Sequence, residues 1–162
     1  MKKTTLFLFL LFGLVVTAQQ SKFPNLTLKN LDGKSVNISK YNSTDKPTII
    51  SFWATWCGPC VNELSAIHNV YDQWQDELNI ELIAISIDDA RTKRRVKPMI
   101  NGKGWNYEVI LDDNNDLKRA MNITNVPYTI VVYKGEVIYE HSNYTPGSEK
   151  EMFRIIKSKV KK

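Results

Sequence analysis

Two cysteines, Cys57 and Cys60, are the residues of this chain best suited to covalent chemistry. The sequence of 162 residues holds no other cysteine, and only Gly58 and Pro59 stand between them. At the start of a helix, this spacing brings two cysteines to the Cα separation of about 5.5 Å that a disulfide accepts. The pair can therefore form and break a disulfide with little movement of the backbone.

Two other roles for the pair stay open, namely a permanent structural disulfide and one half of a zinc site. A zinc site made of cysteines needs four ligands, and the sequence has no second Cys-x-x-Cys. His68 and His141 do not have the spacing of metal ligands. A single pair also cannot supply the disulfide framework of a small secreted scaffold. We expect neither a metal nor a cofactor.

The cysteines lie between a predicted strand and a predicted helix. Residues 48–53 are rich in β-branched and aromatic side chains, as in a central strand. From Pro59 to about Leu78, apolar residues recur every three or four positions, which is the period of an amphipathic helix. The free N–H groups and positive dipole end of that helix stabilise a thiolate on Cys57. We predict that Cys57 is the nucleophile and that Cys60, one turn deeper, resolves mixed disulfides.

The two residues between the cysteines fit this junction. Pro59 is tolerated because a residue of the first helical turn has no intrahelical partner for its N–H. Gly58 has no side chain, so it lets the backbone of another chain come close. We expect both residues to lie in the substrate-binding surface.

The rest of the chain alternates between predicted strands and helices. The strands are a hairpin at 23–28 and 36–38 around Asp32-Gly33, then 80–87, 107–111, and a second hairpin at 128–133 and 136–141. The helices are 90–102, despite Pro98, then 114–121, and a last helix with Ser148 as N-cap and Glu151 as its capping-box partner. This order predicts one α/β domain over residues 19–162.

The first 18 residues have the pattern of a secretory signal peptide. A short positive start at residues 1–5 precedes an unbroken apolar run at residues 6–16, and small residues end at Ala18. A membrane-spanning helix needs about 20 apolar residues, so this run is too short to be an anchor. We expect cleavage after Ala18, no stable membrane anchor afterwards, and a periplasmic or secreted protein.

The charge balance does not indicate a nucleic-acid partner. The net charge is +5, and removal of Lys2 and Lys3 with the signal peptide lowers it to +3. The excess is not arranged as a basic patch interleaved with aromatic residues. Residues 91–97 hold five positive charges, which are typical of a solvated helix face. The alternative is a docking surface for an acidic partner or anionic lipid headgroups.

The segment FWATWCGPC, residues 52–60, resembles the active-site segment of thioredoxin-fold proteins. From Phe23 to the C-terminus the chain resembles the TlpA/ResA branch, which comprises secreted or membrane-tethered bacterial thiol-disulfide oxidoreductases. The resemblance implies a thioredoxin fold with a mixed central β-sheet flanked by helices, an N-terminal β-hairpin and an inserted strand-helix unit. It also implies a cis peptide bond between Val126 and Pro127, where the backbone of Val126 would pair with a substrate strand.

The resemblance also assigns roles near the cysteines. Thioredoxin has a buried acid six residues before its first cysteine, where this chain has Ser51. The TlpA/ResA pattern instead has a Glu three residues after the second cysteine, and here that residue is Glu63. We expect Glu63 to exchange a proton with the Cys60 thiol, the alternative being a solvated acid near a helix start. Ser65 replaces the usual proline after this Glu. Trp56 matches the exposed tryptophan that contacts substrates.

Four functions are consistent with these residues. The first is a protein-disulfide reductase that acts on exported proteins, apocytochromes c before haem attachment among them, and receives electrons from a membrane thiol donor. The second, a disulfide oxidase or isomerase, would use the same cysteines. The third, a thiol peroxidase, requires a Thr or Ser three residues before the reactive cysteine, where this chain has Ala54. The fourth is a binding domain with an inert disulfide. We favour a reductase, because Gly-Pro between the cysteines matches thioredoxin, with a potential of about -270 mV. We expect the protein to be a monomer.

Overall fold

The sheet is organised around β3 (Thr48–Trp53), the strand that leads to the cysteines. In the computed structural model, which describes residues 23–160, every residue of β3 is buried. β3 lies between a parallel neighbour, β4 (Glu81–Ser86), and an antiparallel one, β6 (Tyr128–Tyr133). A strand covered on both faces must be mostly apolar on both, which explains its composition. The signal peptide expected over residues 1–18 lies outside the described residues.

The strands of the described residues form one mixed sheet of seven strands, in the order β2-β1-β5-β4-β3-β6-β7. The outer strands are β1 (Thr27–Asn30), β2 (Ser35–Asn37), β5 (Glu108–Leu111) and β7 (Glu136–Ser142). β3, β4 and β5 run parallel, whereas the other pairings are antiparallel. The predicted α/β class is therefore confirmed, with its N-terminal hairpin and mixed sheet.

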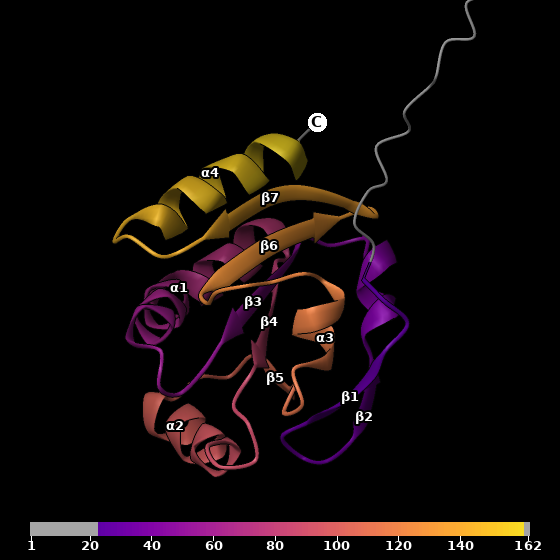
Figure 1. Ribbon diagram of the computed structural model, residues 1–162. Coiled ribbons are helices and arrows are strands. Elements are labelled where there is room, and N and C mark those ends of the chain that lie inside the picture. The colour runs from indigo at the N-terminus through magenta and orange to yellow at the C-terminus, as the bar shows by residue number, and fades with distance from the viewer. Residues whose placement is uncertain (1–22, 161–162) are drawn as a thin grey trace, which may run out of the picture.

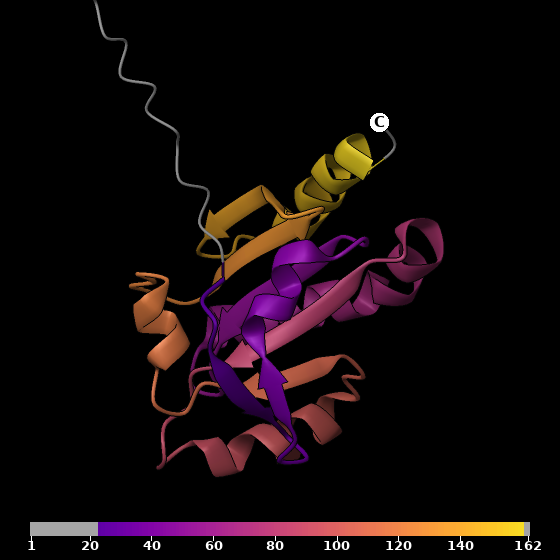
Figure 2. The same cartoon turned by 90° about the vertical axis from the view of Figure 1, so that its right-hand side faces the viewer.

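The helices cover the sheet in two layers. They are α1 (Gly58–Leu78), α2 (Val96–Lys103), α3 (Asp116–Ala120) and α4 (Ser148–Val160), with short 3-10 segments η1 (Ile38–Ser43) and η2 (Lys93–Arg95). Figure 1 shows α1, α2 and α4 on one side of the sheet and α3 on the other. Figure 2 looks from the α3 side, with η1 and the β1–β2 hairpin in front. The inserted unit consists of α2 and β5, between β4 and α3.

Aromatic contacts join two of the helices to each other and join the sheet to the segment after α2. Trp74 of α1 stacks on Phe153 of α4, with ring centroids 4.8 Å apart. Trp53, fully buried at the end of β3, meets Trp105 edge to face at 5.5 Å. Such pairs add about 0.5–1.5 kcal/mol beyond their buried area. The first pair joins α1, which carries the cysteines at its start, to α4, and the second joins the end of β3 to the segment after α2.

The helix expected over residues 90–102 begins later than predicted. The Asp89 carboxylate accepts the N–H groups of Arg91 and Thr92, which forms a local turn in place of the first helical residues. η2 follows, and α2 begins only at Val96. Pro98 thus falls in the first turn of α2, where its missing N–H has no intrahelical partner, so it does not interrupt the helix.

The capping box expected at the start of the last helix is wrong. Glu151 forms an ion pair with Arg154 at 2.6 Å, so its carboxylate does not reach back to Ser148. The Ser148 hydroxyl instead donates to the carbonyl of Thr145, and Glu149 accepts the N–H of Gly147. An arginine one turn away offered the carboxylate a stronger, charged partner than a backbone N–H.

The first hairpin is also shifted from its predicted bounds. The N–H of Leu26 bonds to the carbonyl of Pro24, so this segment turns before β1 begins. At the tip, the Asn30 side chain accepts the N–H of Lys34, and Gly33 adopts a φ of +77°. That conformation is one that glycine adopts without a steric penalty. Within residues 23–160, no helix has both the length and the apolar character that a membrane span requires.

Candidate active site

The two cysteines form a disulfide at the N-terminus of α1. Cys57 is the N-cap residue, and its Cα lies 5.3 Å from that of Cys60. The Sγ of Cys57 accepts a hydrogen bond from the backbone N–H of Cys60 at 3.3 Å. The sulfur therefore lies where the free N–H groups of a helix stabilise negative charge.

Access to the two sulfurs is unequal. Cys57 is 7% exposed to solvent, whereas Cys60 is fully buried. Beside them Trp56 is 57% exposed, the one large hydrophobic residue of the described chain that projects this far into solvent. A partner protein therefore reaches Cys57 before Cys60 and meets a flat aromatic surface next to it.

A buried aspartate anchors the loop that carries Trp56 and Cys57. Asp88, in the segment after β4, is fully buried. Its carboxylate accepts the backbone N–H of Thr55 at 2.8 Å and the Thr55 hydroxyl at 2.6 Å. It also accepts the Ser86 hydroxyl at 2.9 Å. This side chain joins the ends of two neighbouring parallel strands at the entrance to α1.

The peptide bond between Val126 and Pro127 is cis, as the resemblance implied. Tyr128, the next residue, pairs with Phe52 near the end of β3, so the proline and the cysteines lie at the same end of the sheet. The carbonyl of Pro127 accepts the N–H of Asn143. Within residues 23–160, no hydrogen bond engages the backbone of Val126, which leaves its N–H and C=O open to an incoming strand.

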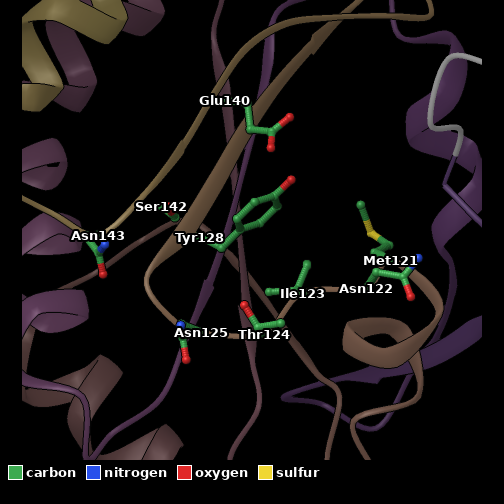
Figure 3. Close-up of a pocket in the computed structure, with 9 residues that line it drawn as sticks. All are labelled: Met121, Asn122, Ile123, Thr124, Asn125, Tyr128, Glu140, Ser142 and Asn143. Carbon is green, nitrogen blue, oxygen red and sulfur yellow. The ribbon is translucent and has the colours of Figure 1, made fainter. Parts of the chain in front are cut away.

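A polar recess of about 360 Å³ lies beside the cis-proline, on the α3 side of β6 and β7. Figure 3 shows its lining: Met121, Asn122, Ile123, Thr124, Asn125, Tyr128, Glu140, Ser142 and Asn143. Burial, together with a hydrogen bond to Glu140, raises the pKa of Tyr128 above its ordinary value. The recess thus carries one carboxylate, a neutral phenol and several amides.

A row of polar side chains crosses the opposite face of the same strands. Ser51 of β3 pairs in register with Thr129 of β6, and Thr129 pairs with His141 of β7. Glu63 of α1 packs against this row and is only 1% exposed. Its Oε1 lies 2.6 Å from His141 Nε2 and accepts the Thr129 hydroxyl at 3.1 Å. Glu63 is therefore a buried, hydrogen-bonded acid one helical turn beyond Cys60, and the alternative of a solvated acid is wrong.

Two polar residues of this region were missed by the sequence analysis. Asp88 directly precedes the helix expected over residues 90–102 and was given no role, and His141 was considered only as a metal ligand. No local pattern marks either residue, because each meets its partners through strand pairing. Burial, and to a lesser extent the nearby carboxyl of Glu63, raises the pKa of Tyr139, the residue whose ring contacts His141.

The basic residues 91–97 are largely paired with acids on neighbouring segments. The ion pairs are Arg91 with Asp89, Lys93 with Asp113, and Lys97 with Asp32. Arg94 and Arg95 have no ion-pair partner in the described part of the chain. Among residues 23–160, no group of three or more His, Cys, Asp or Glu side chains is arranged to hold a metal ion.

A cysteine-pair disulfide at the start of a helix, next to a central strand and at the same end of the sheet as a cis-proline, defines a thioredoxin-like protein. The chain matches the AhpC/TSA family model over residues 20–155. It belongs to the AhpC/TSA family.

Individual relatives agree with this assignment. The chain is 26% identical to thiol-disulfide oxidoreductase ResA of Bacillus subtilis (strain 168) over 122 residues, which are 75% of this chain and 65% of that protein. It is 45% identical to a thioredoxin-like protein from Porphyromonas gingivalis, with a TM-score of 0.76 and coverage of 88% and 94% of the two chains. StoA from Bacillus subtilis shares the fold, at 20% identity and a TM-score of 0.63. The alignment covers 80% of this chain and 94% of that chain.

Proposed function

We propose that this protein is an extracytoplasmic thiol-disulfide oxidoreductase that reduces disulfides in exported proteins. The observation that carries the proposal is the disulfide itself, between a cysteine that contacts solvent at a helix N-terminus and one that is fully buried. Similarity to ResA, whose name describes this chemistry, supports it. The apolar run at residues 6–16 supports a location outside the cytoplasm.

The first step is attack by Cys57. In the reduced form, the Cys57 thiolate attacks one sulfur of a substrate disulfide, and the other substrate sulfur leaves as a thiolate. A mixed disulfide then joins Cys57 to the substrate. The N–H of Cys60, which contacts Cys57 Sγ in the oxidised form, supports stabilisation of the thiolate before the attack.

The second step is resolution by Cys60. The Cys60 thiol gives its proton to Glu63, and the resulting thiolate attacks Cys57 Sγ. The Cys57–Cys60 disulfide forms, and the substrate leaves with both of its sulfurs reduced. A side chain in a helix leans towards the N-terminus, so Glu63 leans over the turn that contains Cys60. Burial of Glu63 supports this role, since bulk water cannot serve as the base there.

Substrate contacts follow the exposed surface around Cys57. Trp56 offers a flat apolar face, and the open space above Gly58 leaves room for a second backbone beside Pro59. The unengaged backbone of Val126, held by the cis bond to Pro127, is suited to pair with an extended substrate segment. The adjacent recess lined by Glu140 is suited to a cationic or amide side chain of that segment (Figure 3).

The direction of electron flow depends on the reduction potential of the cysteine pair. We measure it by equilibrating the purified protein with thiol-disulfide buffers of known ratio. A potential at or below about -250 mV supports a reductase supplied by a membrane thiol donor. A potential near about -120 mV would instead place the protein with disulfide oxidases. Ala54, fully buried and without a hydroxyl, gives no support to a thiol peroxidase.

A further inference from the structure

His141 forms the shortest contact of the buried acid next to the cysteines. Its Nε2 lies 2.6 Å from Glu63 Oε1, although 78 residues separate the two in the sequence. The histidine belongs to β7, and its side chain is 14% exposed against 1% for Glu63. The contact therefore joins α1, which carries the cysteines, to a strand that carries none of the proposed catalytic residues.

The two oxygens of Glu63 have different surroundings. Oε1 contacts both His141 Nε2 and the Thr129 hydroxyl, which lies 3.0 Å from the Ser51 hydroxyl. Oε2 is buried and has no hydrogen-bond partner within residues 23–160. A buried polar atom without a partner is rare in folded proteins, and such an atom is often kept for function. One oxygen of Glu63 is thus fixed, and the other stays free to take a proton.

The position of the ring hydrogen of His141 depends on the surroundings of its second nitrogen. Nδ1 is buried and has no partner among the described residues. A hydrogen on Nδ1 would leave a buried donor unsatisfied, which costs about 1–3 kcal/mol. With its hydrogen on Nε2 the ring donates to Oε1, and Nδ1 is then a buried acceptor without a partner among the described residues. The geometry therefore favours donation from His141 Nε2 to Glu63 Oε1.

We infer that His141 is a positioning residue for Glu63, which fixes Oε1 so that Oε2 receives the proton of the Cys60 thiol. This inference rests on the proposed oxidoreductase function and adds a residue to it. Thr129 assists as the second donor to Oε1. Without His141, the carboxylate would lose its shorter hydrogen bond and rotate more freely.

The other titratable groups near His141 are identified by the elements packed around it. They are Glu63 of α1, Tyr139 on the same strand, Tyr144 after β7, and Glu149 and Glu151 at the start of α4. Glu149 accepts a hydrogen bond from Tyr144, and Glu151 is paired with Arg154. Glu63 is the one that contacts His141 Nε2, so a pH effect of replacing His141 reports on this pair first.

The test follows the two thiol reactions separately in one stopped-flow trace. Reduced protein is mixed with dithiobis(nitrobenzoate), an aromatic disulfide that releases a coloured thiolate at each step. The first release reports attack by Cys57, which leaves Cys57 bound to the probe. The second reports attack by Cys60 on that mixed disulfide, with the Cys60 proton passing to Glu63. Both phases are measured between about pH 5 and pH 8, the range in which histidine titrates.

We expect His141→Leu to slow the second phase about tenfold or more and leave the first unchanged, because only resolution uses Glu63. The pH profile of the second phase should change and that of the first phase should not, because only the second phase uses the carboxylate that has lost a donor. His141→Gln should restore the rate to within about twofold, since its amide N–H reaches the former Nε2 position without titrating. His141→Asn, whose amide corresponds to Nδ1, should not restore it.

The controls separate the inference from the proposed function. Glu136→Gln, an exposed change on β7, should leave both phases unchanged. If His141→Leu fails to fold, the contrast between the Gln and Asn variants carries the test alone. Equal second-phase rates and pH profiles in all His141 variants would overturn the positioning role. A wild-type protein that releases no thiolate from the probe would instead overturn the proposed function.

Discussion

Asp88 holds Thr55 by two hydrogen bonds, one to its backbone N–H and one to its hydroxyl, two residues before Cys57. The loop that presents the nucleophile is therefore tied to the strand next to β3. Because Asp88 is fully buried, its acceptors cannot be replaced by water without opening the structure. The position of Cys57 thus depends on a carboxylate in the segment that follows the neighbouring strand, β4.

Asp88→Ala should reduce both stability and activity. The change leaves the partly buried donors of Thr55 and the buried hydroxyl of Ser86 without acceptors, so the free energy of unfolding should fall by about 2–3 kcal/mol. Urea unfolding gives the stability, and reduction of a protein disulfide gives the activity. Thr55→Val is the milder comparison, because it removes the hydroxyl and keeps the backbone N–H. An unchanged urea midpoint in Asp88→Ala would contradict the anchoring role.

Replacing Cys57 and replacing Cys60 should have different effects on the reaction with substrate. Cys57→Ser removes the sulfur that contacts solvent and should abolish turnover, whereas Cys60→Ser should accumulate mixed disulfides between Cys57 and substrate proteins. Non-reducing gel electrophoresis with mass spectrometry of the adducts detects them. The reverse pattern, with adducts on Cys60, would refute the assignment of nucleophile and resolving cysteine.

Glu63→Gln tests the proton acceptor directly. Glutamine keeps an oxygen for His141 and Thr129 but cannot take a proton, so turnover should fall about a hundredfold with little change in KM. Asp76→Asn, an exposed change on the same helix, is the matched control and should behave like the wild type. A pH-rate profile identical to that of the wild type would remove Glu63 from the mechanism.

Asp112 should make stability depend on pH. Burial raises the pKa of Asp112, and hydrogen bonds from the N–H groups of Lys118 and Leu117 offset this in part. The folded state then binds the proton more tightly than the unfolded state, whose carboxyl has a pKa of about 3.9. The stability from this group is therefore fully present below that value and is lost as pH rises through the raised pKa.

The Asp112→Asn variant isolates this contribution. Asparagine does not ionise, so the variant should gain stability relative to the wild type as pH rises from about 4 to 7. It loses one acceptor for the N–H of Leu117 or Lys118, which shifts the comparison by a constant amount at every pH. Urea unfolding at several pH values measures the difference, and a difference that does not change with pH would rule out the raised pKa.

The sequence by itself determined the cysteine pair, the elements on either side of it and the order of strands and helices. These features are local, since β-branched runs mark β3 and a three-to-four period marks α1. Glu63 was identified through the resemblance to the TlpA/ResA pattern, and its place one helical turn beyond Cys60 puts it on the same side of the helix. The errors in the predicted helices and strands were confined to their ends. There, side chains such as Asp89 and Glu151 bind partners that hydrophobic periodicity does not reveal.

Only the tertiary structure decided which polar groups surround the site. Ser51, Thr129 and His141 form one row because β3, β6 and β7 pair in a particular register, and a shift of one residue would turn His141 to the other face. Asp88 reaches Thr55 in the same way, through the parallel pairing of β3 with β4. Strand register depends on packing across the whole sheet, so a single sequence determines the chemistry of the cysteines but not the partners that tune it.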